Sequence, residues 1–359
     1  MTIGIHAEAD LLAQRTGVEE YLYHLLKQFT SLAKEKQQQI ILYYRTNRAL
    51  DFLESDIFIK KELKWPMLWT QIRLAFECLI YPPDILFVPA QIPPLFSNVK
   101  TVITVHGLEF LRYPDKYSLF KRNYLYWGTK IACKKASAII AVSESTKNDL
   151  MHYFDVPENK ITVIHHGFSV FSNDIAVKSI FEWPYFIYIG RVETKKNIDG
   201  LIKSFTLFKA KTGYAHKLVL AGKRGFGFEK ISSIVAKSEY KDDIIFTGYV
   251  DEKTKFDLLK HAAALVFPSW YEGFGFPILE AQSTGTAVIT SDVSSMGEVS
   301  GDGAILINPE SYQEISAAMA LVVDNLEFKR GLIDKGFLNL KRFSWEKCAR
   351  ETFNVLINA

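Results

Sequence analysis

Short apolar runs recur along the whole chain, and most of them end in glycine or proline. Clear examples are residues 84–89, 100–107, 136–142, 185–190, 217–222, 243–248 and 262–267. Runs that are apolar almost throughout are typical of parallel strands buried on both faces of a sheet. Between them lie segments with helical spacing, such as Val18, Tyr21, Leu22 and Leu25. This alternation predicts an α/β fold built from Rossmann-like units.

A chain of 359 residues is too long for one ordinary core, which predicts two domains. The irregular stretch at residues 168–181 interrupts the series of strands and is interpreted as the link between them. We therefore expect an N-terminal domain at residues 1–172 and a C-terminal domain at residues 173–342. Apolar residues at positions 345, 348, 349 and 353 predict a closing helix, in which Trp345 is interpreted as a packing residue.

Charge and cysteine content limit the class of protein. The formal net charge of +3 is too small to predict a nucleic-acid-binding protein, but it is compatible with an anionic substrate or an anionic membrane surface. Three widely separated cysteines give neither a disulfide framework nor a zinc spacing, and they indicate a reducing compartment. We expect no signal peptide and no membrane span, because no run reaches about 18 apolar residues. These features predict a cytoplasmic protein.

Two stretches combine aromatic and basic residues. They are residues 65–74, which contain two tryptophans and an arginine, and residues 120–130. Amphipathic segments of this kind can lie in a membrane interface, and they serve equally well as half-buried surface helices. A peripheral position on the inner membrane surface therefore stays open.

The segment Ser269–Glu280 joins a buried strand to a helix through alternating glycines and aromatic residues. Pro277 is expected at the first helical position, where a missing N–H is tolerated. The free N–H groups and partial positive charge of a helix start favour an anion. If that anion is a phosphate linked to sugars on both sides, Glu272 and Glu280 can accept hydroxyl hydrogen bonds on either flank. The turn would then hold a nucleotide sugar; the alternative is a tight turn with two solvated glutamates.

Four further candidates stand just beyond strands. Gly17 ends a polar loop and would let the backbone approach a phosphate, with a plain turn as the alternative. His106 lies at the carboxyl end of a strand, where open α/β sheets bind ligands, with a structural loop histidine as the alternative. Arg191 can donate hydrogen bonds to two phosphate oxygens at once, and the Lys196 ammonium can add a compact positive charge. Together these side chains would neutralise a diphosphate leaving group. The alternative there is two solvated surface cations.

Taken together, these segments resemble glycosyltransferase family 4, whose retaining enzymes have the two-Rossmann architecture called GT-B. The resemblance covers nearly the whole chain and is strongest from Val102 to Pro309. The residues that carry it are Val105-His106-Gly107, Val142–Thr146, Gly190-Arg191 through Lys196-Asn197, Leu220–Gly222, Phe246–Tyr249 and the paired glutamates of Glu272–Glu280.

The resemblance implies a role for each candidate. Arg191 and Lys196 would hold the donor diphosphate, Glu280 the ribose hydroxyls and Glu272 the donor sugar, while His106 would face the reacting sugar from the other domain. The catalytic candidates are thus His106, Arg191, Lys196 and Glu272, and the substrate-binding candidates are Gly17, Gly190, Gly248, Tyr249, Gly273, Phe274, Gly275, Phe276 and Glu280. Gly248 and Tyr249 would meet the base, and the loop ending in Gly17 would close over the phosphates. The last helix, about residues 343–359, would cross back onto the first domain.

Two positions depart from the pattern of the family. The first loop has Arg15-Thr16 before a single Gly17, where the family often has paired glycines. Gly107 stands where the family often has an aspartate after the histidine. The first departure concerns the geometry of the loop, and the second removes an orienting carboxylate.

The resemblance predicts a metal-independent hexosyltransferase that needs no cofactor. The donor expected first is GDP-mannose and the second a UDP-hexose, with a hydroxyl of a glycan or lipid-linked saccharide as acceptor. Residues 69–71 and 86–90 resemble bacterial mannosyltransferases of lipopolysaccharide, O-antigen or exopolysaccharide synthesis. The alternatives left open are a GT-B nucleotide-sugar epimerase and a non-catalytic glycan-binding protein.

Overall fold

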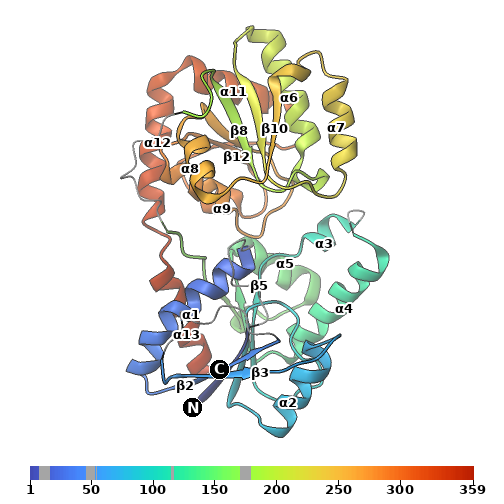
Figure 1. The fold of residues 1–359 in the computed structure, drawn as a ribbon, viewed down its shortest axis with the longest axis vertical. Coiled ribbons are helices and arrows are strands. Elements are labelled where there is room, and N and C mark those ends of the chain that lie inside the picture. The colour runs from blue at the N-terminus through green and yellow to red at the C-terminus, as the bar shows by residue number, and fades with distance from the viewer. Residues whose placement is uncertain (8–16, 46–52, 54, 115–116, 170–178) are drawn as a thin grey trace. The chain divides into compact units, whose positions relative to one another are not determined.

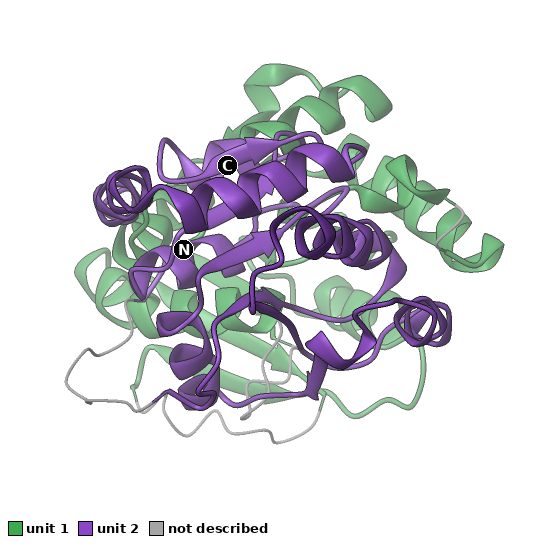
Figure 2. Ribbon diagram, turned by 90° about the horizontal axis from the view of Figure 1, so that it is seen from above, with its two compact units in different colours: residues 1–167, 343–359 green, residues 168–342 purple. Residues whose placement is uncertain are grey.

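The computed structural model describes residues 1–7, 17–45, 53, 55–114, 117–169 and 179–359. The chain divides into two compact units (Figures 1 and 2). Unit 1 contains residues 1–167 and 343–359, and unit 2 contains residues 168–342. The boundary expected from the sequence, at residues 172 and 173, lies outside the described residues.

Unit 1 is built on a parallel sheet whose strands lie in the order β3-β2-β1-β4-β5-β6-β7. The strands are β1 (Thr2–His6), β2 (Gln39–Tyr44), β3 (Phe58–Glu62), β4 (Ile85–Val88), β5 (Thr101–Val105), β6 (Ala138–Ala141) and β7 (Ile161–Val163). The helices are α1 (Gly17–Glu35), the π-helix η1 (Thr70–Leu74), α2 (Ala75–Ile80), α3 (Glu109–Arg112), α4 (Leu119–Lys135), α5 (Glu144–Phe154), the 3-10 helix η3 (Glu158–Lys160) and α13 (Trp345–Asn358). Strands β2 and β3 lie on one side of β1 and the later strands on its other side, so the order of strands reverses between β1 and β4, where Ile3 pairs with Ile85.

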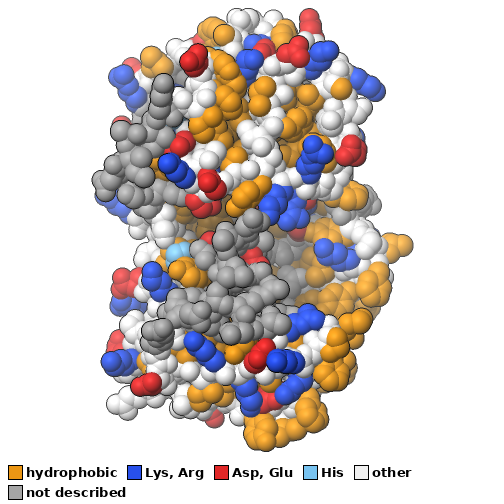
Figure 3. Space-filling model, in the orientation of Figure 1, with side chains coloured by type: hydrophobic (Ala, Val, Ile, Leu, Met, Phe, Trp, Pro, Cys, Tyr) orange, Lys and Arg blue, Asp and Glu red, His pale blue; other side chains and the backbone are white. Residues whose placement is uncertain are grey.

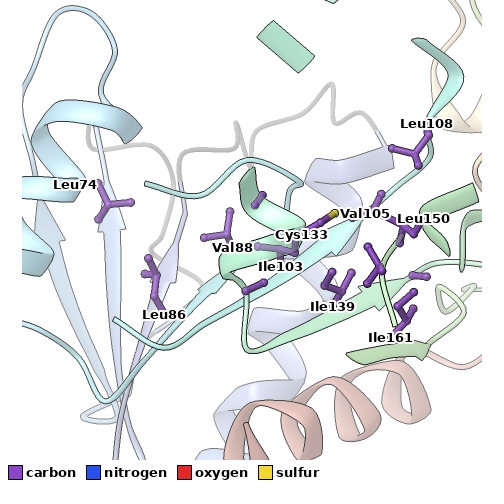
Figure 4. Close-up of a cluster of buried hydrophobic side chains, with 14 of the residues drawn as sticks. Leu74, Leu86, Val88, Ile103, Val105, Leu108, Cys133, Ile139, Leu150 and Ile161 are labelled. Atoms are coloured by element: carbon purple, nitrogen blue, oxygen red, sulfur yellow. The ribbon is translucent and has the colours of Figure 1, made fainter. Parts of the chain in front are cut away.

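The two faces of this sheet carry different helices. Leu86 and Val88 of β4 belong to a buried cluster that includes Leu74, Cys133 and Leu150, from η1, α4 and α5 (Figure 4). Side chains alternate along a strand, so Phe87 points to the opposite face, where its ring lies 6.4 Å from that of Phe29 in α1. Helices α2, α4 and α5 therefore cover one face, and α1 and α13 cover the other (Figure 1).

Unit 2 repeats the same plan with its own parallel sheet, ordered β10-β9-β8-β11-β12-β13. The strands are β8 (Tyr185–Ile189), β9 (Lys217–Ala221), β10 (Ile244–Gly248), β11 (Ala264–Phe267), β12 (Val288–Ser291) and β13 (Ile305–Ile307). The helices are the 3-10 turns η4 (Thr194–Lys196) and η5 (Lys241–Asp243), with α6 (Ile198–Thr212), α7 (Phe228–Ala236), α8 (Glu252–Lys260), α9 (Phe276–Ser283), α10 (Met296–Ser300), α11 (Tyr312–Asp324) and α12 (Leu326–Leu340). Counted along the chain, the strand order is 3-2-1-4-5-6, which is the Rossmann order. The strand order reverses between β8 and β11, where Ile187 pairs with Leu265, and this reversal is the topological switch point of the sheet.

The predicted α/β class with two Rossmann-like units is confirmed. In the part of the chain that the structure describes, no helix is long and apolar enough to cross a bilayer.

Candidate functional site

Two segments of unit 2 meet beside the switch point between β8 and β11. One runs from β8 through Arg191 into η4, and the other runs from β11 into α9. Lys196 Nζ donates to both carboxylate oxygens of Glu272, at 2.6 and 2.7 Å. The two side chains are 15% and 14% exposed, so the pair is shielded yet accessible to a ligand. Doubly wound sheets bind nucleotides at this place in the topology.

Hydroxyl and amide groups hold the turn that carries Glu272. The hydroxyl of Ser294 donates to the Glu272 carbonyl at 2.5 Å, and the Ser295 hydroxyl lies 2.8 Å from the carbonyls of both Glu272 and Phe274. The buried amide of Asn197 donates to the carbonyls of Pro268 and Pro309 at 3.1 and 2.8 Å. The backbone around the carboxylate is therefore fixed by side chains from two other segments.

The helix after this turn begins one residue earlier than expected. Gly275 caps α9 with φ of +113°, a conformation that glycine adopts more readily than other residues. Phe276 is thus the first helical residue, and the expectation that Pro277 occupies that position was wrong by one. The rings of Phe274 and Phe276 pack edge-on with centroids 5.2 Å apart. Gly273 and Phe276 are half-buried, whereas Phe274 and Gly275 are buried.

Glu280 forms a second ion pair, with a lysine that the sequence analysis missed. Lys255 of α8 donates to Glu280 Oε1 at 2.7 Å and to Glu252 Oε1 at 2.9 Å. Lys255 and Glu280 are each 13% exposed. Burial alone would lower the pKa of Lys255, but the Glu280 and Glu252 carboxylates raise that pKa above its ordinary value. Lys255 is thus a firmly charged group beside the second carboxylate of the signature.

Three neighbouring strands of unit 2 end in glycine with positive φ. Gly190 after β8, Gly222 after β9 and Gly248 at the end of β10 have φ of +141°, +148° and +71°. The N–H of Gly222 donates to the Gly248 carbonyl at 2.8 Å, and a Cβ on Gly222 would lie 1.9 Å from the Gly190 carbonyl oxygen. Only glycine fits this close approach, which leaves the carboxyl edge of the sheet free of side chains at these points.

Arg191 and Tyr249 border the same edge. Arg191 is exposed and forms no ion pair with another described residue, while its carbonyl accepts a hydrogen bond from the Tyr188 hydroxyl at 3.1 Å. Tyr249 is 49% exposed, and Lys223 Nζ lies 4.8 Å from the centre of its ring. The predicted contacts of Arg191 with a diphosphate and of Tyr249 with a base stay predictions.

His106 in unit 1 is half-buried at the end of β5, and both of its ring nitrogens have protein partners. Nε2 donates to the Pro89 carbonyl at 2.9 Å, which leaves Nδ1 of the neutral ring to accept from His166 Nε2 at 3.3 Å. The two rings are stacked, with centroids 5.2 Å apart, and Tyr21 packs edge-on against both. Burial lowers the pKa of His106 to about 4, so the ring is neutral near pH 7. Its predicted contact with a sugar stays a prediction.

His166 was missed by the sequence analysis. It is 2% exposed and follows β7 in the triplet His165-His166-Gly167. The pair of adjacent histidines is the sequence feature by which it could have been found. Burial, together with the neighbouring His106 and His165, lowers the pKa of His166 well below its ordinary value. Its neutral ring therefore orients His106 through a hydrogen bond.

Gly17 is the first residue of α1 and is exposed, but the loop that it ends lies outside the described residues. Among the residues that the structure describes, no group of three or more histidine, cysteine, aspartate or glutamate side chains is placed to hold a metal ion. Metal independence and the lack of a cofactor stay predictions.

Two family models match the chain. The model described as Glycosyltransferase Family 4 matches residues 15–170, and the model described as Glycosyl transferases group 1 matches residues 174–337. The first match falls on unit 1 and the second on unit 2, with the Lys196–Glu272 pair inside it.

Among curated proteins, O-antigen chain mannosyltransferase B of Escherichia coli is 29% identical over 268 residues, which are 71% of this chain and 70% of that protein. The serotype-specific mannosyltransferase WbdA of Escherichia coli is 27% identical over 263 residues. That match covers 70% of this chain but 32% of WbdA, so the chain spans about a third of that relative. Among solved structures, HepE of Anabaena, crystallised with UDP and glucose, has a TM-score of 0.75 at 15% identity, over 100% of this chain and 99% of that chain.

Proposed function

The chain belongs to the family 4 glycosyltransferases with the GT-B fold, and from that premise we propose that it moves a hexose from a nucleotide sugar to a hydroxyl of a glycan or a lipid-linked saccharide. Mannose from GDP-mannose is the donor proposed first, because both relatives described above are named mannosyltransferases. A UDP-hexose is the second candidate. The proposed setting is the synthesis of bacterial O-antigen, lipopolysaccharide or exopolysaccharide.

One observation carries the proposal for the donor side. The Lys196–Glu272 pair stands at the switch point of unit 2, between the glycine-lined end of β8 and the start of α9. An ammonium, the exposed Arg191 and a helix N-terminus offer positive charge to a diphosphate. The Glu272 carboxylate offers an acceptor for sugar hydroxyls. Glu280, held by Lys255, offers a second acceptor for the ribose.

The proposed reaction retains the anomeric configuration through attack on the front face. The bond between the sugar C1 and the phosphate oxygen breaks while a bond from C1 to the acceptor oxygen forms. The departing phosphate oxygen takes the proton of the acceptor hydroxyl. Lys196 and Arg191 stabilise the negative charge that develops on the diphosphate, and Glu272 positions the sugar without acting as a nucleophile.

A donor screen followed by a transfer assay tests the proposal. GDP, UDP and ADP, each with its sugars, are compared for the rise in melting temperature that they cause, and GDP-mannose is expected to raise it most. Radiolabelled sugar from the best donor should then appear in a glycan acceptor with the anomeric configuration unchanged. Product formed without an acceptor would indicate an epimerase instead. Binding without donor hydrolysis or transfer would indicate a non-catalytic protein.

We further propose that the acceptor is lipid-linked and that the enzyme works as a peripheral protein on the cytoplasmic face of the membrane. The support is the exposed apolar side chains of residues 65–72, which include Trp65 but not the buried Trp69, together with the exposed aromatic and lysine side chains of residues 120–130. A protein bound to the surface of the bilayer would then reach an acceptor that is anchored in the same bilayer.

A further inference from the structure

Lys255 and Glu280 lie at corresponding places on two helices of unit 2 that pack together (Figure 1). Helix α8 follows the carboxyl end of β10, and α9 follows that of β11. Lys255 is the fourth residue of α8 and Glu280 the fifth of α9, so each lies about one turn from its helix start. Because side chains on a helix lean toward its N-terminus, both lean back toward the carboxyl edge of the sheet. This is the edge at which doubly wound sheets bind nucleotides.

A charged lysine at this place needs compensation from its neighbours. The Lys255 side chain is 13% exposed, and the partial positive charge at the start of α8 opposes a cation nearby. Two carboxylate oxygens offset both effects, Glu280 Oε1 at 2.7 Å and Glu252 Oε1 at 2.9 Å from Lys255 Nζ. The position of the ammonium is therefore set by these two acids and not by the helix that carries it.

The two acids differ in exposure. Glu252 is 74% exposed and reaches the ammonium from solvent, whereas Glu280 is 13% exposed. Figure 3 shows basic and acidic side chains beside one another on the part of unit 2 where α8 lies. A carboxylate has about four lone-pair sites on its two oxygens, so Glu280 can accept hydroxyl hydrogen bonds while it is bonded to Lys255. The contact with Lys255 thus fixes this acceptor in place without using it up.

We propose that Lys255 is a positioning residue, which holds the Glu280 carboxylate where the 2′- and 3′-hydroxyls of a ribose donate to it. Lys255 thereby makes the site select ribonucleotides over nucleotides that lack these hydroxyls. The inference rests on the proposed function, in which Glu280 accepts from the ribose of the donor. Lys255 acts through Glu280 and needs no contact of its own with the nucleotide.

Loss of the Lys255 ammonium would disturb Glu280 in a definite way. Glu280 and Glu252 bond the same nitrogen, so without it two negative carboxylates would be left as neighbours. Their repulsion would turn Glu280 away from Glu252 or favour its protonated form. In either state the fixed, ionised acceptor for the ribose is lost, whereas the groups proposed to bind the base and the phosphates are other residues.

Calorimetry with paired nucleotides tests the role of Lys255. GDP and UDP are each compared with their 2′,3′-dideoxy forms, and the ratio of the two dissociation constants measures the contribution of the hydroxyls. For the diphosphate that binds more tightly, we expect the wild type to favour the ribonucleotide by about tenfold to a hundredfold, as hydrogen bonds to a charged group would give. Lys255→Met should lower this ratio to about threefold or less, because binding of the ribonucleotide weakens and that of the dideoxy form changes little.

Three further variants separate positioning from a general effect on the fold. Lys255→Arg keeps the positive charge and should retain most of the ratio. Glu280→Gln should give a ratio as small as that of Lys255→Met, and the two substitutions combined should lower the ratio no further. Lys253→Met removes an exposed lysine of the same helix and is the matched control, with the ratio of the wild type. Melting temperatures check that all variants fold.

The outcomes separate this inference from the proposed function. If Lys255 only tied α8 to α9, its loss would weaken both nucleotides of a pair equally, and an unchanged or higher ratio in Lys255→Met therefore overturns the proposal. A wild type that transfers sugar from a donor, yet binds both nucleotides of each pair equally well, refutes the role of Lys255 alone. A wild type that binds neither GDP nor UDP contradicts the proposed function and this inference together.

Discussion

The Lys196–Glu272 pair commits one ammonium to both oxygens of one carboxylate. Each side chain is about 15% exposed, so removal of either charge leaves the other in a site with little solvent. A bound sugar hydroxyl would share the carboxylate with the ammonium. A substitution of Glu272, which contacts the sugar in the proposed site, is therefore expected to affect turnover more than it affects the binding of a nucleotide.

Glu272→Gln keeps the shape of the side chain and removes its charge. Turnover is expected to fall about a hundredfold, because an interaction with the reacting sugar is weakened in the transition state. Affinity for GDP, measured by calorimetry, should change little. Glu239→Gln, at an exposed position on the same unit, is the control and should change neither quantity. Unchanged turnover in Glu272→Gln would remove this residue from the site.

Arg191→Ala removes an exposed cation beside the end of β8. A charge-assisted bond to a phosphate is worth about 1.5–3 kcal/mol, so affinity for GDP should fall by about tenfold to a hundredfold. Titration calorimetry measures this change directly. Lys203→Ala, an exposed cation one turn into α6, is the control. Equal affinities of Arg191→Ala and the wild type would contradict the assignment.

The stacked histidines of unit 1 predict a dependence of stability on pH. The pKa of His106 is about 4 in the folded chain against an ordinary 6.5, and the pKa of His166 is lowered as well. Below pH 6.5 the unfolded chain therefore binds more protons, and the free energy of unfolding should fall as the pH drops from 6.5 toward 4. For His106 the loss is about 2–3 kcal/mol after allowance for its partial exposure.

Urea denaturation across this pH range measures the effect. His166→Gln should give a shallower fall in stability than the wild type, whereas His152→Gln, at an exposed position, should give the same fall. A slope that is identical in the wild type and in His166→Gln would show that the pair is not the source.

At the scale of elements, the carboxyl edge of the unit 2 sheet depends on its exit glycines. Gly222 has φ of +148° and its Cα faces the Gly190 carbonyl. An added methyl group would meet this backbone oxygen at 1.9 Å, and backbone cannot move aside as a flexible side chain can. The ends of β8 and β9 would have to separate, and Gly190 would shift together with the residues that follow it.

Gly222→Ala is expected to lower the free energy of unfolding by about 3 kcal/mol or more, through strain at positive φ together with the clash. Gly213→Ala is the matched control, since Gly213 also has positive φ, +67°, but no atom lies within 4 Å of an added Cβ. That control should lose only about 1 kcal/mol. Chemical denaturation compares the two, and equal losses would argue against the close approach at Gly222.

Strand patterns in the sequence predicted the central strands of both sheets and missed three at their edges. The missed strands are β3, β7 and β13. β3 carries Lys60 and Lys61, and β7 and β13 have three residues each. An edge strand is covered less than a central one, so it needs no continuous apolar run.

The sequence also predicted the site residues that lie beside central strands and missed those that depend on helix packing or follow an edge strand. Lys196 and Glu272 were recognisable because each lies just beyond a central strand, where local sequence indicates position. Lys255 was missed because its approach to Glu280 depends on how α8 and α9 pack, which no local pattern reports. His166 was missed because it follows the short edge strand β7, which the apolar pattern did not reveal.

On the scale of the whole molecule, the chain leaves unit 1 after residue 167 and returns to it at residue 343. The returning helix α13 packs on α1, with the Phe353 ring 5.3 Å from Phe29 and the Trp345 ring stacked 4.3 Å from His24. A Cβ on Gly167 would lie 2.2 Å from the Trp345 backbone nitrogen, so the first and last parts of unit 1 touch closely. Unit 2 is continuous in sequence.

Removal of residues 343–359 should therefore destabilise unit 1 and spare unit 2. The truncation would remove several buried side chains, among them Trp345, Phe353 and Leu356, each worth about 1.5–3 kcal/mol. Hydrogen exchange should show faster exchange across β1, β4 and α1 and unchanged protection in β8 and β11. Trp345→Ala should give a smaller change of the same kind, and deletion of Ala359 alone should give almost none. Unchanged exchange in unit 1 after the truncation would contradict this division of the chain.

The split of unit 1 along the chain bears on how the protein is made. As the polypeptide leaves the ribosome, residues 1–167 emerge before unit 2, whereas helix α13, which completes their fold, emerges after unit 2. Unit 2 can fold as soon as it has emerged, while the apolar side of α1 around Phe29 stays uncovered until α13 has emerged as well. A premature stop codon just after unit 2 would thus release a chain with one finished unit and one exposed, chaperone-dependent unit.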